Sequence, residues 1–125
     1  MTDYLTVAEV LAMHVDQIER YGGSQGVRDP GLLESALFRP QTAYYADLIE
    51  EAAALWESMS QNHPFLDGNK RPAFAATYTF LAVNGARLTA NARQTQDFVL
   101  ALYERSQFTF DKLVPWLRKH VVFDK

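Results

Sequence analysis

The sequence predicts an all-α protein, a compact bundle of six helices around one central buried helix. Apolar residues recur at three- and four-residue spacing in six segments, which is the period of a helix with one buried face. The segment from residue 68 to 84 is apolar on nearly all sides, as expected for a helix surrounded by the others. No segment has a convincing strand pattern, and the connections are short. We therefore expect a single domain covering residues 1–125.

The first helix is expected from about Thr6 to Tyr21, with a capping-box pattern at its start and two glycines after its end. Asp29 and Pro30 suit the N-cap and first position of a second, short helix that ends near residue 39.

A third helix is expected from about residue 47 to 62, and Pro64 prevents it from continuing. The central fourth helix begins near Gly68. Two more helices follow, at about 94–105 and 110–120, and the connection before them leaves room for a short extended piece.

Composition excludes several classes of protein. The chain has no cysteine, so disulfides, thiolate metal sites and cysteine nucleophiles are absent. No run approaches the roughly 18 apolar residues of a membrane span, and residues 1–5 do not resemble a secretory signal. The net charge of −3 and the lack of an obvious basic stripe argue against direct nucleic-acid binding. A cytoplasmic protein is expected.

One segment gathers the reactive side chains, in the order His63, Pro64, Phe65, Leu66, Asp67, Gly68, Asn69, Lys70 and Arg71. It opens the most buried helix, whose unpaired N–H groups and dipole favour an anion. Gly68 permits close approach of a ligand, and two cations add positive charge, so a phosphate group fits. Asp67 is a suitable Mg²⁺ ligand beside phosphates. His63, expected at the end of the third helix on its core-facing side, is of the residue type that accepts protons near neutral pH.

Each of these residues also has a structural interpretation. A single histidine is more often structural than catalytic, Asp67-Gly68 resembles a turn, and Asn69 could simply cap a helix. The two cations could be solvated surface charges. A metal site of His63 and Asp67 alone lacks a third nitrogen or sulfur ligand, and the intervening proline breaks the helical geometry. Only the combination favours transfer of a phosphorus-containing group from a Mg²⁺-nucleotide.

The nine-residue motif resembles the signature of the Fic/Doc superfamily, in its death-on-curing (Doc) branch. The similarity extends to flanking blocks at residues 20–23, 26–37, 39–41 and 80–85, and covers roughly residues 5–90. The resemblance implies a Fic/Doc-type six-helix bundle with the motif at its centre. It also implies transfer from a nucleoside triphosphate to a protein hydroxyl.

Two positions distinguish the branches of this superfamily. The larger Fic branch, which transfers AMP, has glycine in place of Lys70 and a second arginine in place of Phe74. The Doc branch has lysine and lacks the second arginine. The resemblance therefore implies that the γ-phosphate of ATP is transferred to a threonine of elongation factor EF-Tu, which stops translation. AMP transfer and a catalytically degenerate binding module remain alternatives.

The resemblance assigns a role to each motif residue. His63 is the general base on the target hydroxyl, and Asp67 holds Mg²⁺ or positions that hydroxyl. Gly68 and Asn69 shape the anion hole. The cations at positions 70 and 71 hold the ATP phosphates and stabilise charge in the transition state.

Further expectations concern neighbouring residues and partners. Phe65 should anchor the loop in the core, and His14, on an apolar helix face, should be a buried core residue. Pro72 stands where Doc proteins usually have threonine and removes an N–H near the anion hole, so by this argument the chain could be a nearly inactive member of the family.

Doc proteins usually pair with an antitoxin whose disordered tail folds on the toxin, and the resemblance implies such a partner.

Overall fold

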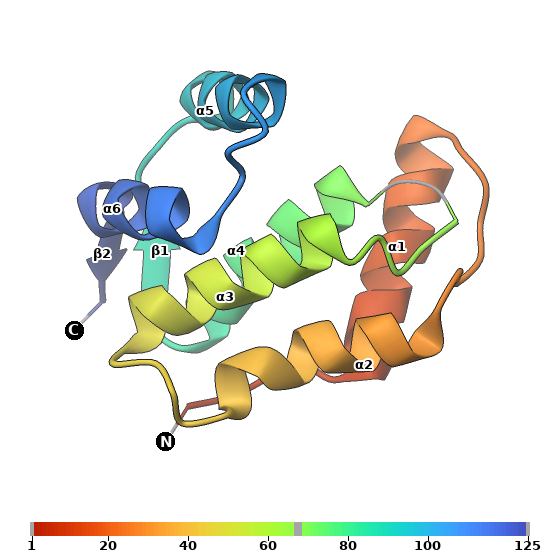
Figure 1. Cartoon of the computed structure of the whole chain (residues 1–125), viewed down its shortest axis with the longest axis horizontal. Coiled ribbons are helices and arrows are strands. Elements are labelled where there is room, and N and C mark those ends of the chain that lie inside the picture. The colour runs from red at the N-terminus through yellow and green to blue at the C-terminus, as the bar shows by residue number, and fades with distance from the viewer. Residues whose placement is uncertain (1, 67–68, 125) are drawn as a thin grey trace.

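The computed structural model describes residues 2–66 and 69–124 and confirms the predicted all-α fold (Figure 1). The described part contains six α-helices, one 3-10 turn and two short strands. In chain order these are α1 (Val7–Tyr21), α2 (Pro30–Phe38), η1 (Arg39–Gln41), α3 (Leu48–Gln61), α4 (Lys70–Val83), β1 (Ala86–Leu88), α5 (Ala92–Glu104), α6 (Phe110–His120) and β2 (Val121–Phe123).

Capping interactions fix where the helices begin. α1 starts with the predicted capping box, in which the Thr6 side chain accepts a hydrogen bond from the N–H of Glu9. α5 begins at Ala92, two residues earlier than predicted, because Asn91 and Gln94 form a second capping box. The predicted start of the fourth helix at Gly68 lies outside the described residues, and the helix observed there begins at Lys70.

The two strands correct the prediction that the chain has none. β1 pairs antiparallel with β2, with Ala86 opposite Phe123 and Leu88 opposite Val121. Three residues are too few to show the alternation by which a strand is recognised in a sequence. The extended piece allowed for after the fourth helix is β1, but its partner is the end of the chain, which only the folded structure brings near.

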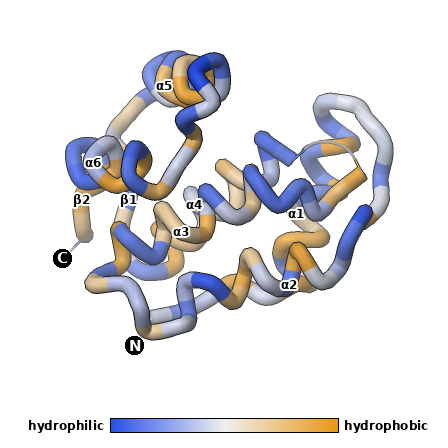
Figure 2. Tube along the Cα trace, in the orientation of Figure 1, coloured by the Kyte–Doolittle hydropathy of each residue, from blue (hydrophilic) through white to orange (hydrophobic). Residues whose placement is uncertain are grey.

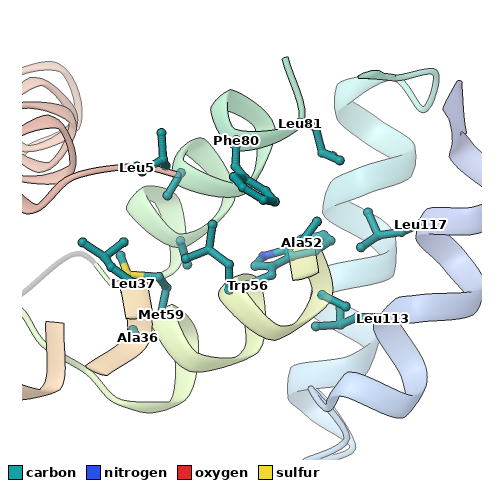
Figure 3. Packing of buried hydrophobic residues seen from close by; sticks show 14 of the residues in the cluster. Leu5, Ala36, Leu37, Ala52, Trp56, Met59, Phe80, Leu81, Leu113 and Leu117 are labelled. Carbon is teal, nitrogen blue, oxygen red and sulfur yellow. The ribbon is translucent and has the colours of Figure 1, made fainter. Parts of the chain in front are cut away.

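The core lies between the two central helices, α3 and α4, which pack against each other in the middle of the bundle (Figure 1). Trp56 of α3 is 1% exposed and lies between Phe80 of α4 and Leu113 and Leu117 of α6 (Figure 3). α1 contacts α4, and α2 contacts α3, on the other side of the pair. Six of the fourteen residues of the predicted central helix α4 are buried, whereas Tyr78 on another face of the helix is 49% exposed.

Hydrophilic residues gather where the end of α3, the start of α4 and the end of α1 approach one another (Figure 2). This end of the bundle carries the motif. Across residues 2–66 and 69–124, every helix is too short or too polar to cross a membrane.

Candidate active site

The motif loop joins α3 to α4 and is held by the connection between α1 and α2. The backbone N–H groups of Arg28 and Asp29 both donate hydrogen bonds to the carbonyl of Pro64, at 2.7 and 3.1 Å. The N–H of Leu66 donates to the carbonyl of Gly26 at 3.1 Å. Main-chain bonds of this kind do not depend on flexible side chains, so the position of the loop follows from the fold of the first third of the chain.

Arg28 adds a side-chain clamp at the end of α3. Its Nε donates to the carbonyl of His63 at 2.7 Å, and its Nη2 donates to the carbonyl of Asn62 at 2.9 Å. Carbonyls at the end of a helix lack helical partners, and a cation there also matches the helix dipole. The sequence suggests no role for Arg28, although this residue lies in a block that resembles Doc proteins.

His63 differs from the prediction in both conformation and orientation. It was expected on the core-facing side of the third helix, but α3 ends at Gln61 and the His63 side chain is exposed. Its φ of 49° lies in the left-handed region, which costs a non-glycine residue about 1–2 kcal/mol. The following proline disfavours helical backbone at this position, and the guanidinium of Arg28 binds the carbonyl of the strained residue. The His63 side chain is thereby exposed to solvent.

Asn69 shapes the loop instead of capping α4. Its side chain accepts a hydrogen bond from the N–H of Phe65 at 3.0 Å and donates to the carbonyl of the same residue at 3.3 Å. No side-chain hydrogen bond from Asn69 to the start of α4 is present. The Asn69 side chain therefore does not cap α4, and its amide instead links residue 69 to the backbone of residue 65.

Phe65 anchors the loop in the core, as predicted. Its ring is 1% exposed and stacks on the ring of His14, with centroids 3.8 Å apart and planes 4° apart. His14 belongs to α1 and is 2% exposed, which confirms that it is a buried core residue. The loop is thus fixed both by the stacked rings of Phe65 and His14 and by main-chain hydrogen bonds to the α1–α2 connection.

Lys70 and Arg71 are the first two residues of α4, and both side chains are exposed. The ammonium nitrogen of Lys70 lies 4.4 Å from the centroid of the Tyr103 ring, and Cζ of Arg71 lies 4.2 Å from that of Tyr21. Neither tyrosine was singled out in the sequence, because each contact joins the motif to a distant helix.

The two cations and Asn69 line a cleft of about 1070 Å³ between α1, α4 and α5. Its remaining wall is largely apolar and includes Phe74 and Val99. His63 is not among the described residues that line this cleft, although it belongs to the same loop. The structure therefore brings together Asn69, Lys70 and Arg71 on one surface.

Pro72 is the third residue of α4 and is buried. The first helical hydrogen bond runs from the N–H of Ala73 to the carbonyl of Asn69 at 3.1 Å. The N–H that proline lacks would precede this bond and would have no helical partner, so Pro72 removes no hydrogen bond from α4.

The Mg²⁺ ligand predicted from the motif, Asp67, and the anion-hole residue Gly68 lie outside the described residues. Among residues 2–66 and 69–124, no cluster of three or more histidine, aspartate or glutamate side chains suits a metal ion. A site that relies on nucleotide phosphates and water needs only one or two carboxylates. The exposed cations of the cleft have the charge that would suit the phosphates of such a nucleotide.

Comparison with known proteins identifies the family. The chain belongs to the Fic/DOC family, whose sequence profile matches residues 4–81, more than half of the chain. Toxin Doc of Mycolicibacterium smegmatis is 47% identical over 96 residues, covering 73% of this chain and 72% of that protein. Protein kinase doc of Escherichia phage P1 is 36% identical over 89 residues, covering 68% of this chain and 71% of that protein. The resemblance to the Doc toxin branch is thereby confirmed.

Proposed function

We propose that this protein is a Doc-like toxin kinase that transfers the γ-phosphate of ATP to a threonine hydroxyl of a target protein. The observation that carries the proposal is the position of Lys70 and Arg71 in the first turn of α4, at the edge of the cleft. Two cations and the N–H groups of a helix start together attract a triphosphate. The name of one relative, protein kinase doc, supports the same chemistry.

Phe74 favours phosphoryl transfer over AMP transfer. The AMP-transferring branch has an arginine here, and its forked guanidinium suits the outer phosphates. In this chain Phe74 lines the cleft and packs against Trp56 and Tyr78, with ring centroids 5.6 and 6.1 Å apart. An apolar wall offers no donors to phosphate but accommodates a nucleoside. The phosphates are then left at the cationic edge of the cleft, where the γ-phosphate is the group that reacts.

In the proposed step, the imidazole of His63 accepts the proton of the target hydroxyl while the hydroxyl oxygen attacks the γ-phosphorus. An oxygen–phosphorus bond forms, the bond from the γ-phosphorus to the bridging oxygen breaks, and ADP leaves with that electron pair. Lys70 and Arg71 stabilise the negative charge on the phosphates. Asp67 would hold Mg²⁺ together with phosphate oxygens, and the metal would add positive charge beside the phosphates.

The target and partners in this proposal follow from the resemblance to Doc toxins. The target is EF-Tu, modification of which stops translation, and the site of action is the cytoplasm. An antitoxin with a disordered inhibitory tail would bind the toxin and block it. The name of the relative Toxin Doc supports a toxin function.

The test is transfer of label from ATP carrying it on the α- or the γ-phosphate, with Mg²⁺, into purified EF-Tu and into a bacterial lysate. His63→Ala is the inactive variant. The matched control is His120→Ala, since His120 is a partly exposed histidine at the end of α6 that does not belong to the motif loop. Label from the γ position that is lost in His63→Ala but kept in His120→Ala supports the kinase.

Two other results would replace the proposal. Label from the α position would assign the chain to AMP transfer despite Phe74. Binding of MgATP without any transfer would favour the degenerate binding module, and restoring threonine at Pro72 would then show whether the missing N–H had silenced the site.

A further inference from the structure

The ring of Tyr103, near the end of α5, lies beside the first residue of α4. The ammonium nitrogen of Lys70 is 4.4 Å from the ring centroid, inside the roughly 6 Å over which a ring face attracts a cation. In the part of the chain that the structure describes, no carboxylate lies within ion-pair distance of this ammonium. The described partner of Lys70 is therefore an aromatic ring.

The Tyr103 ring is fixed by its surroundings. It stacks on Phe108, with centroids 4.6 Å apart and planes 11° apart, and Phe108 is 1% exposed. Its hydroxyl is buried, as is that of Ser60 on α3. Burial raises the pKa of the Tyr103 hydroxyl, although the nearby Ser60 hydroxyl opposes the shift, so the phenol is neutral near physiological pH. The ring attracts Lys70 through its face, not through a negative charge.

We propose that Tyr103 is a positioning residue, whose ring holds the Lys70 ammonium at the cleft for the phosphates of the nucleotide. This inference rests on the proposed phosphoryl transfer and deepens it. A lysine side chain is a flexible stem with a point charge, so a free Lys70 would sample many positions. A ring held by the core restricts the ammonium before the nucleotide arrives, and less freedom is then lost on reaching the transition state.

The second cation has a weaker hold. Cζ of Arg71 lies 4.2 Å from the Tyr21 ring, but Tyr21 is 58% exposed and itself lines the cleft. A solvated ring attracts a cation less than a desolvated one does. Replacing Tyr21 should therefore cost less transfer activity than replacing Tyr103.

The test is a double-mutant cycle that measures γ-phosphate transfer and MgATP binding for Tyr103→Leu, Lys70→Met and the double variant. Removing the ring should lower kcat/KM about 3- to 30-fold, the range expected for a cation–ring contact, with most of the loss in kcat. Tyr103→Phe keeps the ring and should stay within about 2-fold of the wild type. In the Lys70→Met background, Tyr103→Leu should have no further effect, because the ring acts only through Lys70.

A readout independent of activity is the proton NMR spectrum of the Lys70 side chain. The ring current should shift its ε-methylene protons upfield in the wild type and in Tyr103→Phe, but not in Tyr103→Leu. Tyr44→Leu is the matched control, because Tyr44 is 82% exposed and belongs to the connection before α3, outside the motif. Thermal unfolding of every variant shows which ones fold. If Tyr103→Leu does not fold, the spectra of the wild type and of Tyr103→Phe decide whether the ring contacts Lys70.

The outcomes separate this inference from the proposed function. If the wild type transfers no phosphate, the proposed kinase function is wrong. The NMR spectra and the double-mutant cycle of MgATP binding still test the contact between Tyr103 and Lys70. The positioning role is wrong if Lys70 shows no ring shift, or if Tyr103→Leu costs the same factor with and without Lys70. It is also wrong if Tyr103→Phe is as impaired as Tyr103→Leu, since the hydroxyl and not the ring would then matter.

Discussion

Replacing Arg28 with alanine should loosen the motif loop while leaving the bundle folded. The guanidinium makes two hydrogen bonds, at 2.7 and 2.9 Å, to the carbonyls of His63 and Asn62. Such bonds contribute about 0.5–1.5 kcal/mol each in general, and the exposed position of Arg28 places them in the lower part of that range. We therefore expect a loss of about 1–2 kcal/mol in the free energy of unfolding.

The same change should reduce catalysis, because Arg28 holds the residue that carries the proposed general base. His63 has a φ of 49°, and without the clamp its backbone can relax toward an unstrained conformation. If about 1–2 kcal/mol of local stabilisation is lost, the transfer rate should fall by roughly 5- to 30-fold. Arg28→Lys keeps a charge but not the fork, so it should recover only part of the loss.

The assay combines urea unfolding with steady-state γ-phosphate transfer for Arg28→Ala, Arg28→Lys and one control. Arg87→Ala is the control, because the side chain of Arg87 is 63% exposed and pairs with Asp124 at a distance of 3.5 Å. That variant should stay within about 0.5 kcal/mol of the wild type. If Arg28→Ala matches the control in both stability and transfer, the clamp has no role and the reasoning is refuted.

Three further predictions concern local conformation and pH. Because His63 has a left-handed backbone, His63→Gly should be more stable to urea than His63→Ala by about 1 kcal/mol, and the opposite order would contradict this conformation. Gly26 has a φ of 129°, and a Cβ there would lie 2.9 Å from Cδ1 of Leu66, so Gly26→Ala should cost about 1–3 kcal/mol in urea unfolding, mainly through backbone strain. Burial raises the pKa of Asp47, but hydrogen bonds from the Glu50 N–H and from Arg118 outweigh it and hold the pKa below its usual value. This carboxylate therefore stabilises the fold fully at pH values above its unfolded-state pKa, near 4, and the contribution is lost as the pH falls through the lower folded-state pKa. When unfolding is measured as a function of pH, Asp47→Asn should lose less stability on acidification than the wild type.

Local chemistry explains why so much of the fold could be predicted. The capping box at Thr6, the proline after Asp29 and the apolar spacing of α3 act within one or two turns of helix, so the sequence contains all the groups involved. The observed helix boundary differs from the predicted one where apolar spacing alone was used. α5 begins earlier than its apolar pattern indicates, because Asn91 caps it. The β1–β2 pair was missed because its strands are short and come from distant parts of the chain.

The sequence by itself determined the family and predicted the candidate site residues, because the motif is contiguous and its anion-attracting groups come from one helix start. Only the tertiary structure decided how those residues are held. The φ of His63 depends on contacts with the α1–α2 connection. The position of the Lys70 ammonium depends on the ring of Tyr103 from α5. These contacts join residues far apart in the chain, and no short-range pattern specifies which distant side chain will fill the space beside a given one.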